Sequence, residues 1–185
     1  MKRIKYVGLA LVVVCALSAA AVASAGAHDF SASAVAALKG TAKQTQVFTT
    51  AAGKVECSTL SVTSGTTALL ALTQSATVQY SGCKAFGLAA TVSPAQYVFS
   101  ADNGLVRIAS SITIKATACL VTVPGNQDLT TVAYKNSGAE IVLEPNVTGI
   151  TSEGSGAACT YAKESKGTYT GNSSVSIAGG TLKWN

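Results

Sequence analysis

Alternation of apolar and polar side chains with a period of two is the feature that most constrains the fold of this chain. In the stretch LVRIASSITIKA, residues 105–116, apolar side chains stand at even positions and arginine, threonine and lysine at odd ones. The apolar positions are Val106, Ile108, Ile112 and Ile114. Because successive side chains of a β-strand point to opposite faces, this pattern predicts a half-buried antiparallel strand.

The same alternation returns in shorter segments, separated by residues that favour turns. These segments are TVQY at 77–80, QYVFS at 96–100, TVAY at 131–134, EIVLE at 140–144, SVSI at 174–177 and TLKW at 181–184. Asn103-Gly104 and Asn136-Ser137-Gly138 can supply the positive backbone dihedrals of tight hairpins. Short strands with glycine turns predict an all-β chain, an antiparallel β-sandwich with a β-barrel as the alternative.

The first 25 residues have the order of parts of a secretory signal peptide. Lys2, Arg3 and Lys5 form a basic start, an apolar run follows, and Ala23-Ser24-Ala25 is a cleavage signature of small residues. Ala25-Gly26-Ala27 offers a second cleavage site, and the alternative is an uncleaved membrane anchor. We expect residues 1–25 to be removed, so the protein meets the membrane only during export.

The remaining residues, 26–185, are expected to form a single all-β domain. Residues 26–36 are rich in alanine and serine, and we expect them to be a loose lead-in. Removing the leader takes away three of the 13 basic residues and none of the 8 acidic ones, which leaves a net charge of about +2. The other lysines are scattered singly, so the chain lacks the basic stripe that nucleic-acid binding requires.

Four cysteines follow the leader, at Cys57, Cys83, Cys119 and Cys159. An even number in an exported chain predicts disulfides, and four cysteines allow three connectivities. We favour Cys57–Cys83 and Cys119–Cys159, because sequential pairing is the simplest for neighbouring strands of a meander. A zinc site is the competing use, but zinc prefers close cysteine pairs and these cysteines are far apart in the sequence.

Histidine is nearly absent, which excludes most hydrolytic machinery based on that residue. The single histidine is His28, so Ser–His or Cys–His catalysis would depend on it alone. Cleavage after Ala25 would make Gly26, Ala27 and His28 an amino-terminal nitrogen set suited to Cu(II) or Ni(II). We expect instead an incidental histidine in a loose terminus, and no metal or other cofactor.

Other catalytic patterns are weak. Ser81-Gly82-Cys83-Lys84 matches the S-x-x-K motif of penicillin-recognising enzymes, but that motif belongs at the start of a helix and its companion motifs are missing. A pair of carboxylates could hydrolyse glycans as acid and base. The candidate carboxylates are Glu56, Asp102, Asp128, Glu140, Glu144, Glu153 and Glu164.

Three tyrosines share the phase of the apolar positions in their segments. Tyr80, Tyr97 and Tyr134 are therefore expected to be core residues with a polar tip at the rim, rather than an exposed aromatic row that stacks on sugars.

Five stretches of the chain carry a resemblance to a known group of proteins: TAKQTQVFTT, VQYSGCKAFG, VTVPGNQDL, PNVTGIT and GTYTGNSSVSIAGGTLKW. Through these stretches the chain resembles, over nearly its whole mature length, uncharacterised secreted β-rich proteins of actinobacterial type. The resemblance implies a Gram-positive exporter and an extracellular or wall-associated destination. The group has no assigned activity, so the resemblance supplies no catalytic residue.

Together these patterns predict a non-catalytic secreted β-domain with two disulfides. We expect it to act as an extracellular or cell-surface binding or structural module, with an extracellular or cell-wall ligand that the sequence does not identify. The alternative is a secreted, glycan-directed hydrolase that uses two of the carboxylates named above.

Overall fold

A computed structural model describes residues 28–102, 104–130 and 132–185. In these ranges the backbone forms strands and turns, and no helix is present that could cross a membrane. The strands are β1 (Phe30–Ala32), β2 (Leu38–Ala42), β3 (Gln46–Thr50), β4 (Gly53–Ser64), β5 (Leu70–Ala71), β6 (Thr73–Ala85), β7 (Leu88–Val92), β8 (Ala95–Ser100), β9 (Val106–Ile108), β10 (Ile112–Ala116), β11 (Cys119–Val123), β12 (Gln127–Leu129), β13 (Val132–Ser137), β14 (Glu140–Ser155), β15 (Tyr161–Thr170), β16 (Ser173–Ile177) and β17 (Leu182–Trp184).

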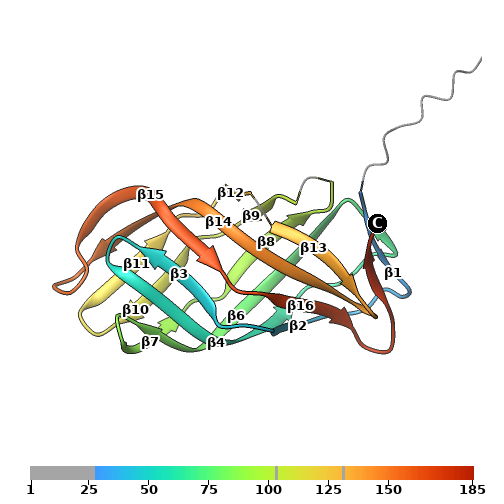
Figure 1. Cartoon of the computed structure of the whole chain (residues 1–185), viewed down its shortest axis with the longest axis horizontal. Helices are drawn as coiled ribbons and strands as arrows, with labels where there is room; N and C mark the ends of the chain where they lie inside the picture. Colours follow the sequence, from blue (N-terminus) through green and yellow to red (C-terminus); the bar gives the residue numbers. More distant parts are fainter. Residues whose placement is uncertain (1–27, 103, 131) are drawn as a thin grey trace, which may run out of the picture.

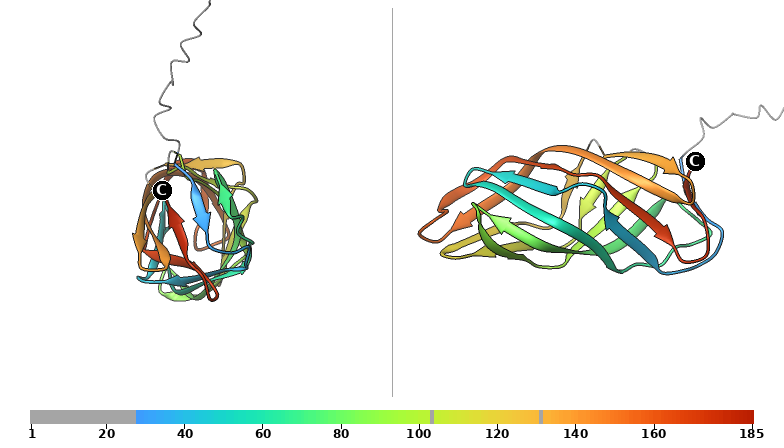
Figure 2. Two further views of the ribbon diagram at one scale, coloured as in Figure 1. Left: turned by 90° about the vertical axis from the view of Figure 1, so that its right-hand side faces the viewer. Right: turned by 60° about the horizontal axis from the view of Figure 1, so that its bottom comes forward.

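The strands form one antiparallel sheet of 14 strands and a smaller sheet of three, in the order β17-β1-β5. The large sheet runs β12-β9-β8-β6-β7-β10-β11-β14-β15-β3-β4-β2-β16, with β13 paired to β14. Two further pairings, β4 with β6 and β14 with β16, connect strands that are apart in this order, so the sheet folds back over itself. The body is elongated (Figure 1), and seen end-on its strands surround a common interior (Figure 2). The prediction of an all-β, sandwich-like antiparallel fold is confirmed.

The alternating segments lie in strands as predicted, with one difference in the stretch 105–116. This stretch forms two strands, β9 and β10, rather than one. The chain changes neighbours at residues 109–111, because β9 pairs with β8 and β12 whereas β10 pairs with β7 and β11. Its four apolar side chains nevertheless all face the interior, with exposed fractions of 5% or less.

Strands β4 and β6 pair with each other over most of their length. In the middle of each strand, the set of positions that faces the interior switches between even and odd residue numbers, a phase change in the alternation. On β6 the inward positions are even up to Tyr80 and odd from Cys83 onward. Gly82 lies at this step with φ of +61°, and an added Cβ there would lie 2.2 Å from the hydroxyl oxygen of Ser58 on β4. A side chain at this position would be strained and would clash, so the phase change depends on glycine.

A second phase change lies in β14. The buried positions are odd at Ile141, Leu143 and Val147 and even from Ile150 onward. The register with β15 shifts between Val147 and Ile150, and Gly149 between them has φ of +79°. This irregularity turns Ile150 inward after Val147, and the inward positions that follow it on this strand of 16 residues are Ser152 and Gly154.

The small sheet fastens the two ends of the described chain to each other. Strand β1 pairs with β17 in the register Phe30↔Trp184, and the side chain of Phe30 is 6% exposed. Residues 30–32 are therefore part of the fold, which corrects the expectation of a loose lead-in over 26–36, because the ring of Phe30 packs in the interior. The expected signal peptide, residues 1–25, and both cleavage sites lie outside the described residues.

Two disulfides are present, Cys57–Cys83 and Cys119–Cys159, with Cα–Cα distances of 4.0 and 5.3 Å. These are the sequential pairs that we favoured among the three connectivities. Cys57 and Cys83 stand opposite each other on β4 and β6, while the second disulfide holds the turn between β14 and β15 against the start of β11. Disulfides persist in oxidising compartments, and two of them hint at such an environment for this chain.

Candidate functional site

An apolar cavity of about 150 Å³ lies in the interior between the strands. Its wall is built mostly from valine, isoleucine, leucine and phenylalanine side chains, and none of the described residues that line it is charged. Its polar groups come from four tyrosines, two glutamines and a serine: Tyr80, Tyr97, Tyr134, Tyr169, Gln46, Gln74 and Ser173.

The size of the cavity is large for a protein interior. Interiors normally pack as densely as organic crystals, with few voids larger than a water molecule. An empty cavity of this volume would cost about 3–4 kcal/mol, at the increment of about 24 cal/mol per Å³ measured for core truncations. That is a substantial share of the 5–15 kcal/mol by which domains are typically stable.

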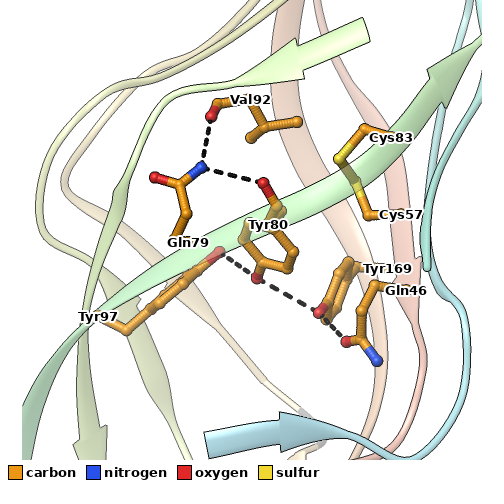
Figure 3. Close-up of a disulfide and its surroundings, with 8 residues drawn as sticks. All are labelled: Gln46, Cys57, Gln79, Tyr80, Cys83, Val92, Tyr97 and Tyr169. Carbon is orange, nitrogen blue, oxygen red and sulfur yellow. Dashed lines mark hydrogen bonds between the residues drawn. A yellow bond between two sulfur atoms is a disulfide. The ribbon is translucent and has the colours of Figure 1, made fainter. Parts of the chain in front are cut away.

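Four wall residues, Tyr97, Tyr80, Tyr169 and Gln46, join their polar groups in a hydrogen-bonded series that we call the tyrosine relay (Figure 3). The hydroxyl of Tyr80 lies 3.0 Å from that of Tyr97 and 3.3 Å from that of Tyr169. The hydroxyl of Tyr169 donates to Oε1 of Gln46. The members come from β8, β6, β15 and β3, so the relay joins four strands of the large sheet at the cavity wall.

The direction of the relay follows from the side-chain amide of Gln46. Its nitrogen donates to two backbone carbonyl oxygens at 2.7 and 3.1 Å, which leaves its oxygen to accept from Tyr169. A phenol has one proton, so Tyr169 accepts from Tyr80, and Tyr80 accepts from Tyr97. The protons therefore point from Tyr97 towards Gln46, and the oxygen of Tyr97 keeps capacity to accept a further hydrogen bond.

Burial keeps these phenols neutral. Removal from water raises the pKa of Tyr80 and Tyr97 well above the usual value, and it raises the pKa of Tyr169 as well. Neutral phenols donate and accept hydrogen bonds but are poor bases and nucleophiles. The relay therefore connects side chains of four strands and does not provide an activated group for hydrolysis.

The relay predicts unequal effects for removal of its hydroxyls. Tyr169→Phe should lower the free energy of unfolding by about 2–3 kcal/mol, because it leaves both the oxygen of Gln46 and the proton of Tyr80 without a partner. Tyr97→Phe should cost about 1 kcal/mol, because it leaves no donor unpaired. Urea unfolding of both variants measures the difference, and equal losses would show that the assigned direction is wrong.

Of the tyrosines expected in the core, Tyr80 and Tyr134 are buried and Tyr97 is partly buried against the core, but their hydroxyls are not at the rim. Figure 3 shows the hydroxyls of Tyr80 and Tyr97 meeting inside the molecule, and the side chain of Tyr134 is 6% exposed. Tyr169 and Gln46 were not singled out from the sequence. The contact between them joins residues 123 positions apart, and no local pattern signals it.

None of the carboxylates proposed for glycan hydrolysis lines this cavity. Four of them form ion pairs: Asp128 with Arg107, Glu140 with Lys43, Glu144 with Lys135 and Glu164 with Lys166. The other three, Glu56, Asp102 and Glu153, are exposed. Glu164 is partly buried, and its Oε1 has no hydrogen-bond partner within the described residues.

The pKa values of two of these carboxylates are shifted downward, opposite to the upward shift that a catalytic acid needs. The hydrogen bond from Arg107 lowers the pKa of Asp128, and that from Lys43 lowers the pKa of Glu140. A general acid in glycoside hydrolysis instead needs a raised pKa, so that it carries a proton near neutral pH. Neither residue fits that role.

The S-x-x-K match lies in the wrong structural context for a nucleophile. Ser81 and Lys84 are on strand β6, both are exposed, and Cys83 between them is disulfide-bonded. The motif requires a helix start that brings the serine and lysine together. Here Gly82 and Cys83 have structural roles: Gly82 allows the change in alternation on β6, and the sulfur of Cys83 is bonded to Cys57.

His28 packs against the carboxyl-terminal residues. Its ring stacks on Trp184 with a centroid distance of 4.4 Å, and Nδ1 donates to the backbone oxygen of Asn185 at 2.6 Å. One ring nitrogen is therefore already engaged. Gly26 and Ala27, the other members of the possible copper set, lie outside the described residues. Within the described ranges, no group of three or more histidine, cysteine, aspartate or glutamate residues is arranged to hold a metal ion.

Comparison with known proteins adds no relative to this picture. Neither a family model, nor a curated protein sequence, nor a solved structure matches the chain.

Proposed function

We propose that this chain is an exported, non-catalytic binding module whose ligand is a small apolar molecule held in the interior cavity. The single observation that carries the proposal is the cavity of about 150 Å³ with an uncharged, largely apolar wall. A cavity of this size lined by aliphatic and aromatic side chains can bind a molecule the size of benzene. A bound ligand would offset the stability that the cavity costs.

The polar residues favour binding over catalysis. The tyrosines of the cavity wall hold their protons, and the carboxylates with shifted pKa are ionised and paired on the outside. A hydrolase would need a base or nucleophile next to its substrate. These observations support the binding module over the alternative of a glycan-directed hydrolase.

Export is supported by two features that are independent of the cavity. The amino-terminal segment has the basic, apolar and small-residue parts of a signal peptide. The two disulfides suit an oxidising compartment. We propose that the mature protein acts outside the cell or at the cell surface.

Binding is tested with toluene and methylenecyclohexane as small apolar probes. A ligand at 100 times its Kd raises the free energy of unfolding by about 2.7 kcal/mol, so urea unfolding with and without probe reports binding. We expect both probes to stabilise the purified protein, and ligand-observed NMR should show direct contact. The proposal is wrong if neither probe binds.

The location of the probe is tested with a matched pair of variants on β6. Ala76→Phe adds a ring at a buried residue of the cavity wall, whereas Ser75→Phe adds the same ring at the neighbouring exposed position. We expect Ala76→Phe to abolish probe binding and Ser75→Phe to leave it unchanged. Should Ala76→Phe fail to fold, Ala76→Leu is the smaller replacement and should weaken binding. Equal binding by all variants would place the probe elsewhere.

A further inference from the structure

The hydroxyl of Tyr134, a residue of the cavity wall, is buried and has no hydrogen-bond partner within the described part of the chain. Tyr134 lies on β13, lines the cavity and is 6% exposed. The three other tyrosines that line the cavity all make hydroxyl hydrogen bonds, which leaves Tyr134 as the exception among them.

Two described neighbours of Tyr134 are aromatic rings, and neither accepts a hydrogen bond from its hydroxyl. Phe30 on β1 meets the ring of Tyr134 edge-on at 5.4 Å, and Trp184 on β17 lies at 5.9 Å. The indole nitrogen of Trp184 is itself used, because it donates to the backbone oxygen of Ala101 at 2.9 Å. The small sheet thus encloses Tyr134 at one end of the molecule without satisfying its proton.

An unpaired donor in such a place is unusual. The large majority of buried side-chain polar atoms in proteins have a partner, and those that do not call for an explanation. Phenylalanine would fill the same space without a desolvated hydroxyl, so the polar group is a cost to the unliganded fold. Burial also raises the pKa of Tyr134, which keeps its proton available for donation.

We propose that the hydroxyl of Tyr134 donates a hydrogen bond to the ligand, and that the ligand is a neutral, largely apolar molecule with one acceptor oxygen, such as a small ketone, ester or alcohol. This inference rests on the proposed function of the cavity. The apolar body of the ligand occupies the aliphatic part of the wall, and its oxygen faces Tyr134.

The uncharged wall of the cavity indicates that the ligand is uncharged as well. None of the described residues lining the cavity is charged, so an ionised carboxylate or an ammonium group would be buried without a counter-charge. Such burial is strongly unfavourable. The acceptor is therefore uncharged, which excludes ionised fatty acids and amines as ligands at neutral pH.

The test compares two probes of nearly equal shape, cyclohexanone and methylenecyclohexane, which differ in having C=O or C=CH2. Both are titrated against the full mature protein and against Tyr134→Phe. We expect Tyr134→Phe to weaken the binding of cyclohexanone about 5- to 10-fold and to leave the binding of methylenecyclohexane within about 2-fold. Tyr97→Phe is the matched control, because it removes another wall hydroxyl that already has a partner, and it should change the ratio of the two affinities less.

The unliganded variant gives a second readout. Tyr134→Phe should be as stable as the parent protein or more stable, in contrast to the loss expected for Tyr169→Phe. A clear loss of stability would show that the hydroxyl already has a partner, and would overturn the inference. The inference would also be overturned if Tyr134→Phe weakened the binding of both probes equally, or weakened the binding of neither. In those cases methylenecyclohexane still binds the parent protein and the binding function stands, whereas failure of both probes to bind the parent protein is failure of the proposed function itself.

Discussion

Removal of both disulfides is expected to lower the free energy of unfolding by about 7 kcal/mol. The two bonds close loops with sequence separations of 26 and 40 residues, and each contributes roughly 3–4 kcal/mol by restricting the unfolded chain. The sum is comparable to the whole stability of a typical domain. The reduced protein should therefore be largely unfolded at room temperature, as followed by circular dichroism and by urea unfolding with and without reductant.

Two paired variants separate the contributions and serve as controls. The double variant Cys57→Ser/Cys83→Ser should lose about as much free energy of unfolding as the double variant Cys119→Ser/Cys159→Ser. Adding reductant to either variant should then lower the free energy of unfolding further, by the contribution of the disulfide that remains. Non-reducing peptide mapping checks that the remaining pair is intact. If full reduction leaves the unfolding midpoint in urea unchanged, the disulfides are not what holds this sheet together.

Alkaline pH is expected to destabilise the protein steeply. Four tyrosines, Tyr80, Tyr97, Tyr134 and Tyr169, have a raised pKa in the folded state because of burial. In the unfolded chain each ionises near pH 10, whereas the folded protein retains the proton. Their contribution to stability is complete below about pH 10 and is lost as the pH rises above it towards the folded values. The slope is about 1.4 kcal/mol per pH unit for each tyrosine, or about 5.5 kcal/mol per pH unit for four.

Urea unfolding at a series of pH values from about 9 to 11.5 measures this slope, with the disulfides checked on non-reducing gels. Tyrosinate absorbance of the four residues should appear together with unfolding rather than before it. Tyr134→Phe removes one group and should reduce the slope by about a quarter. Gradual ionisation of all the tyrosines near pH 10 in a protein that stays folded would contradict the prediction.

Local pattern was sufficient to predict eight of the 17 strands of the described chain: β6, β8, β9, β10, β13, β14, β16 and β17. The alternation in 105–116 correctly placed Val106, Ile108, Ile112 and Ile114 in the interior, because the two faces of a strand follow directly from backbone geometry. It did not reveal that the chain changes neighbours at 109–111. Pairing partners are set by segments distant in sequence, and alternation carries no information about them.

The phase changes at Gly82 and Gly149 could not be predicted for the same reason. A glycine in a strand signals a bulge, a bend or a close approach, but only the partner strand decides which. At Gly82 the partner is Ser58, whose hydroxyl occupies the space that a side chain would need. Tyr80 and Cys83, three residues apart, both face inward because the backbone of Gly82 between them is left-handed.

The candidate site depended even more on distant contacts. Tyr80, Tyr97 and Tyr134 were expected in the core from their phase, yet whether each hydroxyl finds a partner is decided by other strands. Tyr169 accepts the proton of Tyr80 and Gln46 accepts that of Tyr169, whereas the rings of Phe30 and Trp184 leave Tyr134 unsatisfied. A cavity has no counterpart in a sequence, because it is the space left after all the walls have packed.

By itself, the sequence determined that this chain is built from antiparallel strands with glycine turns, that its cysteines can form two disulfides, and that histidine-based catalysis has almost no residue to use. Those properties depend on residue type and local spacing. Only the tertiary structure decided which strands pair, where the alternation changes phase, which tyrosine hydroxyls are satisfied, and that an apolar space remains between the layers. Each of these depends on the simultaneous packing of segments up to about 150 residues apart, as in the pairing of Phe30 with Trp184.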